Sequence, residues 1–400
     1  GKTAHLSDDA SFVPLFNGRD LDGWHNVNCA PSTWTVRDGR IACSGVPTGV
    51  LRTDKQYENF VFEMEWRHLA EQGNAGLFIW SDPVTARGQP FTRSIEVQVM
   101  TGMEGPGFTS DGDVFPIHGA KMNALTGRQG PGRAFPTEKR VNPGGEWNHY
   151  RVTCVDGKLD LAVNGKLVTQ GTDCKPRKGY LCLESEGAPC EFRNLRIKEL
   201  PSSRAPLTPD FVCDTDAGFR SLYNGLDFTG WKFGAEHDGH WKASDWTIAF
   251  DGEGADLWST EEFGDFELIA DWRWSGAAHD ADLAVIGPSG AQALDADGKA
   301  LTQRVKEAGD SGIYLRGSSK SQVNMWCWPI GSGEVYGYRT DAQMSAEVRA
   351  GVTPRVNADA PLGEWNRFHI TMRGERLTVV LNGVTVIDHA QLPGVAPRGA

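Results

Sequence analysis

Residues 145–168 read GEWNHYRVTCVDGKLDLAVNGKLV, and residues 363–386 read GEWNRFHITMRGERLTVVLNGVTV. In each stretch, apolar and polar residues alternate on both sides of an Asn-Gly step. An Asn-Gly step between two such runs is the strongest short-range signal for a β-hairpin. The two stretches therefore predict antiparallel strands, and their likeness indicates that one structural unit occurs twice in the chain.

Three more blocks recur in the same order, so the whole chain is organised as a tandem repeat. They pair LFNGRDLDGWHN at 15–26 with LYNGLDFTGWKF at 222–233, NFVFEMEWRH at 59–68 with DFELIADWRW at 265–274, and GNAGLFIW at 73–80 with GDSGIYLR at 309–316. We expect a first domain at residues 10–200, a Pro- and Ser-containing linker at 201–215 and a second domain at 216–400. The second copy stops where residues 180–200 of the first continue, so it should lack its last strands.

The composition favours many short strands joined by tight turns. The chain has 400 residues, enough for two large cores, and it contains 48 Gly and 14 Trp. Its formal net charge of −12 argues against a nucleic-acid partner, which would require clustered Lys and Arg. No apolar run approaches the ~20 residues of a transmembrane helix. The sequence thus predicts an all-β protein without a transmembrane segment.

The first residues and the cysteines bear on the location of the protein. The sequence opens with Gly1 and without Met, as expected if a signal peptide had been removed. We therefore expect an exported protein of bacterial type, located in the periplasm, outside the cell or at its surface. The eight cysteines show neither a CxxC spacing nor a Cys/His cluster suited to zinc. For them, disulfides and free core thiols both remain open.

Two blocks have the alternation of strands with one apolar and one polar face. In SIEVQVM, residues 94–100, the polar set is Glu96 and Gln98. In FVFEMEWR, residues 60–67, the polar set contains Glu63, Glu65 and Arg67. Two-faced antiparallel strands at this spacing indicate a sandwich or jelly roll. One face of each sheet would be core, and the other would be free to hold a ligand.

Taken together, these motifs resemble the family of 3-keto-disaccharide hydrolase domains. The first copy shows LFNGRDLDGW, NFVFEMEWR, GNAGLFIW, SIEVQVM, and GEWN followed by AVNG; the second shows LYNGLDFTGW, DFELIADWR, GDSGIYLR, SQVNMWCW, and GEWN followed by VLNG. The resemblance covers nearly the whole chain. It implies two tandem concanavalin A-like lectin/glucanase sandwiches, of the jelly-roll type, that act on sugars oxidised to a ketone at C3.

The two copies depart from the family pattern at different places. The first has Trp80 where an Arg is usual, whereas the second keeps Arg316 there. The second has Asn324 and Trp326 in the region where the family carries a Glu and a Gln. Glu186 of the first copy lies near the usual position of a His. These differences make the first copy the better candidate for an enzyme.

Cleavage of a 3-keto-glycoside needs a base for the acidified C2 proton, a cation or metal to hold the enolate and a proton donor for the leaving oxygen. Glu96 is the first choice for the base, and Glu65 and His118 are the other catalytic candidates. A solvated strand face for Glu96 remains an alternative. A structural ion pair of Glu65 with Arg67, and an incidental loop histidine at His118, also remain open.

The remaining candidates bind substrate or metal. Substrate binding is predicted for Gln98, Arg67, Glu63, Trp80, Lys121, Asn324, Trp326 and Arg316. A carboxylate cluster with one histidine would suit a divalent cation, for which Asp82, His118 and Glu186 are candidate ligands. No sequence spacing establishes a metal. Tryptophans that match between the copies suit core packing, whereas Trp80, Trp326 and Trp328 differ and are the ones to test for sugar stacking.

The sequence predicts an enzyme that cleaves a 3-keto-glycoside by C2 proton abstraction and elimination followed by hydration, or by hydrolysis. A saccharide or glycoside is the expected substrate. The alternative is a non-catalytic, lectin-like carbohydrate-binding protein, because the same sandwich serves both functions. An ordinary two-carboxylate glucanase fits least, because SIEVQVM offers no second acid on its strand.

Overall fold

The computed structural model describes residues 9–103, 105 and 111–400 of the protein. It is 46% strand and 3% helix, which confirms the predicted all-β class. The chain forms two compact units: one runs to Thr229 and includes Lys242–Ala249, and the other consists of Gly230–Trp241 and Phe250–Ala400. Over the described ranges, no helix has the length and apolar character needed to cross a membrane.

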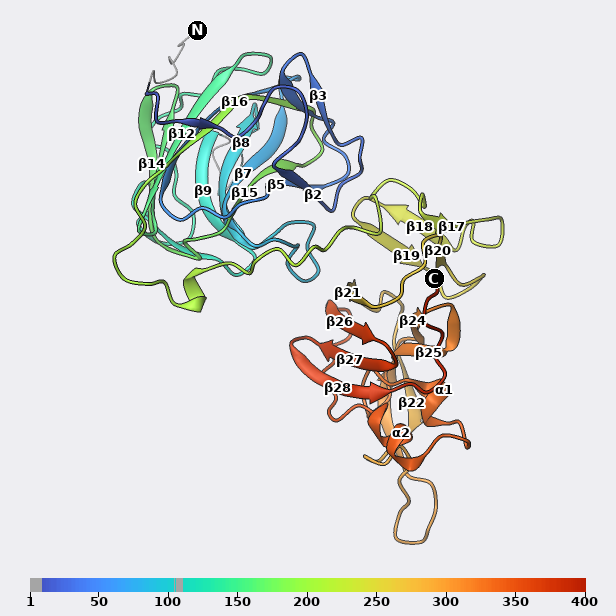
Figure 1. The fold of residues 1–400 in the computed structure, drawn as a ribbon. Coiled ribbons are helices and arrows are strands. Elements are labelled where there is room, and N and C mark those ends of the chain that lie inside the picture. Colours follow the sequence, from blue (N-terminus) through green and yellow to red (C-terminus); the bar gives the residue numbers. More distant parts are fainter. Residues whose placement is uncertain (1–8, 104, 106–110) are drawn as a thin grey trace. The chain divides into compact units, whose positions relative to one another are not determined.

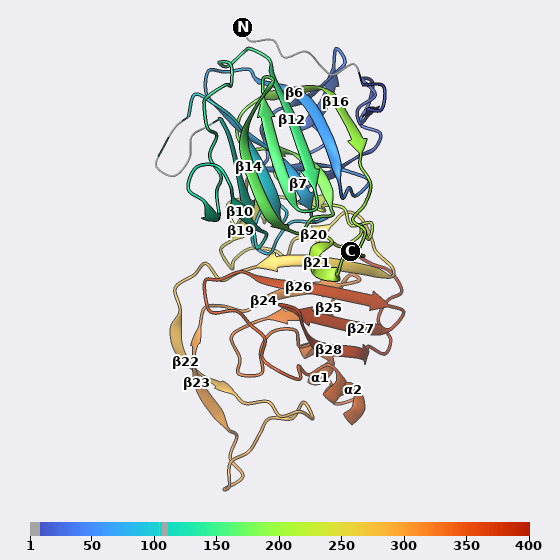
Figure 2. The same cartoon turned by 90° about the vertical axis from the view of Figure 1, so that its left-hand side faces the viewer.

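The first unit is a sandwich of two antiparallel sheets, which appear as two layers in Figure 1. In order across the larger sheet lie β11 (Gly130–Pro131), β10 (Lys121–Ala124), β14 (Lys166–Lys175), β13 (Lys158–Val163), β12 (Asn148–Val155), β6 (Phe60–His68), β16 (Cys190–Glu199), β4 (Arg40–Cys43) and β3 (Trp34–Arg37), with β1 (Val13–Pro14) paired to β16. The smaller sheet runs β2 (Trp24–Val27), β5 (Gly49–Thr53), β15 (Tyr180–Ser185), β7 (Gly73–Ser81), β8 (Ser94–Thr101) and β9 (Asp111–Ile117). Figure 2 shows the larger sheet in front of the smaller one.

The apolar faces of the strands fill the space between the two sheets. The core takes Phe60, Phe62, Met64 and Trp66 from β6 and Ile95, Val97 and Val99 from β8. Full burial of each such side chain stabilises the fold by about 1.5–3 kcal/mol. The predicted alternation is thereby confirmed for both strands. Because side chains alternate along a strand, Glu96 and Gln98 lie on the outer face of the smaller sheet.

The Asn164-Gly165 step forms the turn between β13 and β14, as predicted. The φ angles of the two residues are 46° and 84°, in the left-handed region that a tight hairpin turn requires. The Asn164 side chain accepts a hydrogen bond from the His149 backbone N–H at 2.8 Å. Asn382 and Gly383 have the same geometry in the second unit, with φ angles of 53° and 83°. The repeated sequence therefore encodes a repeated turn.

The second unit is smaller and its sheets are shorter. Its main sheet consists of β21 (Phe266–Trp272), β26 (Asn366–Arg373), β27 (Arg376–Leu381) and β28 (Val384–Gln391). Its strand pairs are β17 (Trp231–Lys232) with β20 (Trp258–Ser259), β22 (His279–Ala284) with β23 (Thr302–Glu307), and β24 (Ser311–Leu315) with β25 (Ser318–Met325). Its helices are α1 (Tyr336–Arg339) and α2 (Ala346–Gly351). The chain passes between the units through β18 (Trp241–Ser244) and β19 (Thr247–Phe250), and the 3-10 turn η1 (Pro209–Phe211) belongs to the first unit.

Two differences between the copies involve whole strands. In the first copy, β15 and β16 follow the strand that closes the Asn-Gly hairpin. In the second copy, β28 closes that hairpin, and no later strand occurs in the part of the chain that the structure describes. The extra residues of the second copy before GDSGIYLR form the β22–β23 hairpin. Among the described residues, β24 and β25 thus form a sheet of two strands.

The first unit extends beyond the boundary expected from the sequence. It includes Asp216, which accepts a hydrogen bond from Arg52 at 3.0 Å, and Asp245, which accepts one from Thr48 Oγ1 at 2.6 Å. These contacts attach residues of the expected second domain to the first unit, at β5 of the smaller sheet and the residue before it. Sequence similarity marks where a repeat begins, whereas the compact unit depends on which side chains these residues contact.

All eight cysteines are free thiols, and seven of them are buried. The structure therefore resolves the open alternative in favour of core thiols. Burial raises the pKa of Cys43 to about 11 and that of Cys182 to about 12. A thiol with such a pKa stays protonated and unreactive at neutral pH, so these cysteines serve as small apolar side chains.

Candidate functional site

The outer face of the smaller sheet carries a cluster of buried carboxyl groups. Glu96 on β8 lies opposite Phe78 of β7, and Gln98 lies opposite Gly76. On the other side of β7, Leu183 of β15 pairs with Leu77, which places the next residue, Glu184, beside Gly76. Strands β8 and β15 therefore direct a carboxyl group each toward the middle of β7 from opposite sides.

Gly76 leaves the room in which these two carboxyl groups meet. A Cβ atom at residue 76 would lie 2.6 Å from Glu184 Oε2 and 3.1 Å from Glu96 Oε1. Since both oxygens lie so close to one point, they are less than about 6 Å apart, within the range over which charges shift each other's pKa. A glycine at this outward-facing position is therefore what allows two acidic side chains to approach each other above the sheet.

Burial controls the protonation of the pair. Glu184 is 1% exposed and Glu96 is 6% exposed. Burial raises the pKa of Glu96 to about 8, with a smaller contribution from Glu186, while the Arg133 guanidinium acts in the opposite direction. Burial, followed by repulsion from Glu96 and Glu186, raises the pKa of Glu184 well above its usual value. Both groups therefore favour the protonated form more strongly than carboxyls in water.

A chain of hydrogen bonds holds a third carboxyl group at the same site. Gln98 Nε2 donates to Asn74 Oδ1 at 2.7 Å, and Asn74 Nδ2 donates to Glu186 Oε2. Glu186 is only partly buried. Burial raises the pKa of Glu186 to about 6, although the Asn74 hydrogen bond acts to lower it. Gln98 and Glu186, both candidates from the sequence, are thus joined through Asn74.

One cation lies close to the cluster. Arg133 follows β11 and donates a hydrogen bond to the fully buried Asp113 of β9 at 2.9 Å. Its guanidinium also lies over the ring of Phe115, 3.5 Å from the ring centroid. Phe115 is the β9 partner of Glu96, so Arg133 stands on the β9 side of that carboxyl group. This position explains why Arg133 favours the ionised form of Glu96.

The outer face is apolar beside the carboxyl groups. Phe78, the neighbour of Glu96, packs edge-on against Phe91 with ring centroids 5.6 Å apart. His118 stacks on Phe91, and the two ring centroids are 6.4 Å apart. Burial lowers the pKa of His118, which favours the neutral imidazole. His118 thus lies along the rim of the site, separated from Glu96 by two phenyl rings.

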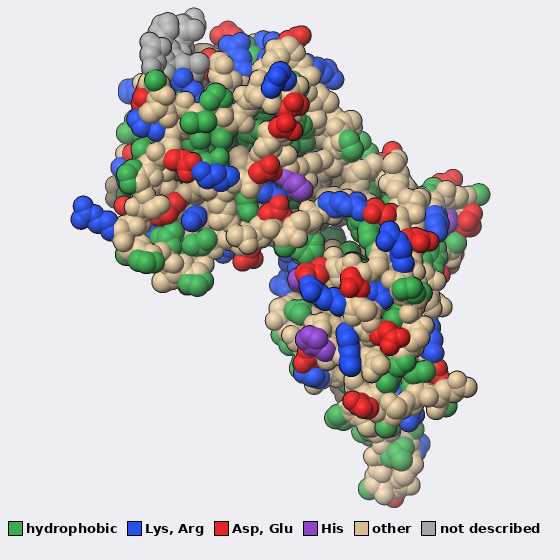
Figure 3. Space-filling view, viewed as in Figure 1, with side chains coloured by type: hydrophobic (Ala, Val, Ile, Leu, Met, Phe, Trp, Pro, Cys, Tyr) green, Lys and Arg blue, Asp and Glu red, His purple; other side chains and the backbone are tan. Residues whose placement is uncertain are grey.

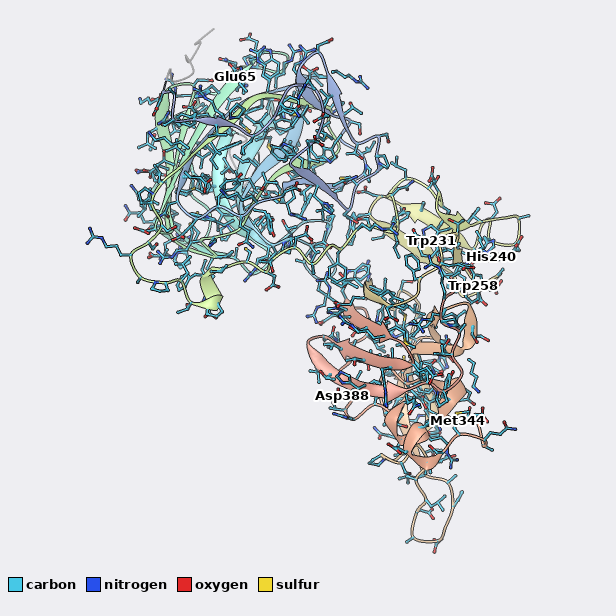
Figure 4. All side chains as sticks on the ribbon, in the orientation of Figure 1. Glu65, Trp231, His240, Trp258, Met344 and Asp388 are labelled. Carbon is cyan, nitrogen blue, oxygen red and sulfur yellow. The ribbon has the colours of Figure 1, made fainter. Side chains whose placement is uncertain are left out.

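The predicted residues of β6 lie on the other sheet of the sandwich. Glu63 pairs with Arg196, whose Nε donates to Glu63 Oε2 at 2.8 Å. Burial acts to raise the pKa of Glu63, but the nearby His149 ring and the hydrogen-bonded Arg196 guanidinium outweigh it and lower the value to about 2. Glu65 accepts a hydrogen bond from Arg193 at 2.7 Å; Figure 4 labels it in the first unit. The structure does not bring these residues together with Glu96.

Arg67, also on β6, belongs to the same outer layer of the larger sheet. Its Nε donates to Glu191 Oε2 at 2.8 Å, and its guanidinium lies over the ring of Trp147. Lys121 is exposed on β10 of that sheet. Glu63, Glu65 and Arg67 each form an ion pair with a residue of β16. They are thus in structural ion pairs, but Arg67 pairs with Glu191 rather than with Glu65, as the sequence had suggested.

Trp80 and Arg316 occupy matching positions at the ends of β7 and β24. Both have a φ of 53°, which interrupts the alternation and turns the side chain away from the outer face. Trp80 is fully buried in the core, and its Nε1 donates to the Glu58 carbonyl at 2.9 Å. Arg316 donates to the carbonyls of three loops and to Asp265 at 3.0 Å. Neither side chain reaches an outer sheet face.

The structure does not bring the three candidate metal ligands together. Asp82 forms a two-point ion pair with Arg93, with distances of 2.8 and 2.9 Å. Asp82 follows the last residue of β7, whereas Glu186 binds Asn74 near the first, so roughly 25 Å of strand lies between them. Over the described parts of the chain, no group of three or more His, Cys, Asp or Glu side chains is placed to hold a metal ion.

Strand register shows what the second unit has at the equivalent site. Gly312 pairs with Asn324, as Gly76 does with Gln98, and Tyr314 pairs with Gln322, as Phe78 does with Glu96. The counterpart of Glu96 is therefore Gln322. Asn324 corresponds to Gln98, and Trp326 falls one pair further along, at the position of Met100. Sequence similarity in SQVNMWCW was too weak to fix this register.

The predicted stacking residue of the second unit is not exposed. Trp326 is 3% exposed, and its Nε1 donates to the Gly331 carbonyl at 2.6 Å. Its ring stacks on Trp328 with centroids 4.5 Å apart. A different aromatic pair lies near the outer face of β24, where the rings of Trp258 and Tyr314 are 5.2 Å apart (Figure 4). Both of these rings are partly exposed.

Sequence reasoning missed three residues of the site. Glu184 follows the alternation of β15, in which Cys182 and Glu184 share the outer face, and this signal was available in YLCLESEG. The alternation of GNAGLFIW likewise places Asn74 on the same face as Gly76 and Phe78. Arg133 comes from a loop whose sequence has no periodicity, so its place beside Glu96 follows only from the fold.

Figure 3 shows acidic and basic side chains interspersed over the surface in that view.

Both copies match a known family. The family model described as 3-keto-alpha-glucoside-1,2-lyase-like domain matches residues 11–198 and 218–399. Among curated proteins, the chain is similar to a 3-keto-disaccharide hydrolase of Bacteroides thetaiotaomicron, with 24% identity over 238 residues that cover 48% of this chain and 80% of that protein. The two matched segments coincide with the two copies that the repeated blocks predict.

Several solved structures are similar to one half of the chain. A Parabacteroides distasonis protein described as a candidate glycosyl hydrolase has a TM-score of 0.38 and 24% identity, covering 50% of this chain and 100% of that one. A carbohydrate-binding module, CBM66, from Bacillus subtilis has a TM-score of 0.34 and 14% identity, covering 44% and 96%. A β-glucanase of Bacillus licheniformis has a TM-score of 0.32 and 14% identity, covering 48% and 97%.

Proposed function

The chain belongs to the family of 3-keto-alpha-glucoside-1,2-lyase-like domains, and we propose that its first copy cleaves 3-keto-glycosides by elimination across C1 and C2. The family and the name of the curated relative point to a carbohydrate-active enzyme. The observation that carries the proposal is the buried pair Glu96 and Glu184 above Gly76. Such a pair supplies an acid and a base at one place, as elimination requires.

The chemistry starts from the ketone. A carbonyl at C3 acidifies the C2 proton, and Glu96 takes that proton as a carboxylate. The electron pair of the C2–H bond forms the C1–C2 double bond, and the C1–O bond to the aglycone breaks with its electrons on the departing oxygen. The products are the aglycone alcohol and a 1,2-unsaturated 3-keto sugar. Addition of water, with hydroxyl to C1 and a proton to C2, then gives the free 3-keto sugar.

The surroundings of Glu96 suit a base that works near neutral pH. Proton transfer is most efficient when the pKa of the catalytic group lies near the operating pH, and burial raises the pKa of Glu96 to about 8. Its 6% exposure leaves a small part of the side chain in contact with solvent. Gln98 and Glu186, joined through Asn74, offer polar groups for sugar hydroxyls beside it. Phe91, which packs on the buried Phe78, is partly exposed and offers an apolar surface for a ring face.

The second copy would either bind saccharide or have a structural role, and in both cases it would not catalyse cleavage. Gln322 has the size and hydrogen-bonding groups of Glu96 but cannot accept a proton at neutral pH. The second copy thus retains the outer face of β24–β25 with Gln322 in place of the proposed base.

A two-carboxylate glycosidase is the second candidate function. The sequence ranks it last because β8 has no second acid, but β15 supplies Glu184 at less than about 6 Å, close to the separation found in retaining glycosidases. The two functions differ in the substrate that they require. An eliminase acts only on the 3-keto sugar, whereas a glycosidase cleaves the unoxidised one.

The test compares 4-nitrophenyl 3-keto-glucoside with unoxidised 4-nitrophenyl glucoside on the full chain, with and without EDTA. We expect nitrophenol release from the oxidised substrate alone, together with exchange of the C2 proton for solvent deuterium. Release from the unoxidised substrate would favour the glycosidase. Release from neither would leave a carbohydrate-binding protein. Loss of activity in EDTA that a divalent cation restores would show that a metal takes part.

A further inference from the structure

Glu184 is the least accessible carboxyl group of the site. It is 1% exposed, and its Oε2 has no hydrogen-bond partner among the described residues. This same oxygen lies over Gly76, on the side facing Glu96. A buried polar atom without a partner costs about 1–3 kcal/mol, so a purely structural role would not favour a glutamate here. The unpaired oxygen is aimed into the space between the two carboxyl groups.

The charged groups around the pair indicate which of the two carboxyl groups stays protonated. Those that influence Glu184 are Glu96 from β8, Glu186 beyond the end of β15, and Cys43 from β4 of the other sheet, and none of them is cationic. Among the described residues, the cation that influences this pair is Arg133, and it acts on Glu96. Two adjacent carboxyls cannot both be ionised at low cost in a buried place. The pair therefore holds at least one proton at neutral pH, and Glu184 is the member that keeps it.

We propose that Glu184 is the general acid of the site, which protonates the C1 oxygen of the departing aglycone while Glu96 takes the C2 proton. The inference rests on the proposed elimination and adds the identity of its proton donor. Two acidic groups on one sheet face, with one protonated and one ionised, supply both ends of a 1,2-elimination from adjacent positions.

The balance of the step is simple. The O–H bond of Glu184 breaks and its proton goes to the aglycone oxygen, which receives the electron pair of the C1–O bond. Glu96 gains the C2 proton. After the step, Glu96 is protonated and Glu184 is ionised, the reverse of the starting state. Transfer of one proton from Glu96 to Glu184 across Gly76 restores the site, and no oxidant, reductant or further reactant is needed.

The experiment compares two leaving groups in Glu184→Gln. The 4-nitrophenolate of 4-nitrophenyl 3-keto-glucoside departs without protonation, whereas the methoxide of methyl 3-keto-glucoside requires an acid. We expect kcat to fall ~10²-fold or more for the methyl glycoside and by less than about 5-fold for the nitrophenyl glycoside. Glu138→Gln changes a partly exposed Glu that pairs with Lys166 of β14 in the larger sheet; it is the matched control and should change neither rate.

The outcomes separate the two proposals. If the wild-type protein cleaves neither 3-keto substrate, the proposed elimination is wrong. If it cleaves both, and Glu184→Gln loses both equally or neither, then only the role of Glu184 is wrong. Infrared spectra give a readout that does not need the variant to fold. At pH 9, where Glu96 with its pKa of about 8 is largely ionised, the wild-type protein should still show the carbonyl band of a buried carboxylic acid, and its absence would overturn the inference.

Discussion

Replacing Glu96 with Gln should abolish turnover and make the first unit more stable at alkaline pH. The amide keeps the size of the carboxyl group but cannot accept the C2 proton. We expect kcat for 4-nitrophenyl 3-keto-glucoside to fall ~10²–10⁴-fold, the usual contribution of a positioned general base. A higher KM with an unchanged kcat would instead mean that Glu96 only binds the sugar.

The stability effect follows from the direction of the pKa shift. Glu96 has a pKa of about 8 in the folded protein and 4.5 in the absence of the fold. Between these pH values the folded chain holds a proton that the unfolded chain has released, so stability falls as pH rises. The slope is roughly 1.4 kcal/mol per pH unit, or on the order of 4 kcal/mol between pH 5 and pH 8. Glu96→Gln removes this loss.

Calorimetry of both proteins from pH 5 to pH 8 measures the difference. At about 2–4 °C per kcal/mol for a unit of this size, the Tm advantage of Glu96→Gln should grow by on the order of 10 °C over this range. Glu138→Gln is the control, because Lys166 and Arg140 lower the pKa of Glu138, which is therefore ionised in both states above pH 5. A Tm difference between wild type and Glu96→Gln that is constant with pH would refute the argument.

Three further perturbations test the site and the fold. Gly76→Ala places a methyl group 2.6 Å from Glu184 Oε2, so we expect kcat to fall at least ~10-fold while circular dichroism shows a retained fold. An unchanged kcat would mean that Glu96 and Glu184 need not approach each other. Arg133→Met removes the cation near Glu96, so the rising limb of kcat/KM against pH should move to higher pH; an unmoved limb would assign that limb to another group. Arg316→Met removes the hydrogen bonds of a buried guanidinium to three backbone carbonyls, and we expect the second unit to lose about 1–3 kcal/mol of stability while the activity of the first copy persists; a variant with unchanged Tm would contradict that role.

Strand faces could be read from the sequence, but the partner sheet could not. The alternation of SIEVQVM and FVFEMEWR predicts the buried residues of β8 and β6. It also places Glu65 and Glu96 on outer faces by the same rule. Nothing in either pattern says that β6 and β8 belong to opposite sheets, so the two glutamates seemed equally available to one site. The pairing of each strand with its neighbours separates them.

Two candidates depended on a backbone detail that alternation does not contain. The left-handed φ at Trp80 and Arg316 interrupts the alternation, so both side chains leave the outer face. Periodicity assumes an unbroken strand, and a single residue with positive φ is enough to invalidate it. The register of Gln322 likewise required the observed pairing of β24 with β25, because a slip of two residues preserves the alternation and is invisible to it.

The amino-acid sequence by itself determined the tandem repeat, the all-β class, the Asn-Gly hairpins and the face on which Glu96 lies. Each of these follows from residues close together in the chain. Only the tertiary structure decided that β15 lies next to β7, which brings Glu184 to the other side of Gly76 from Glu96. That neighbourhood is set by the packing of the whole sandwich core, because pairing between distant strands is stabilised by all the apolar surface that it buries rather than by any local pattern.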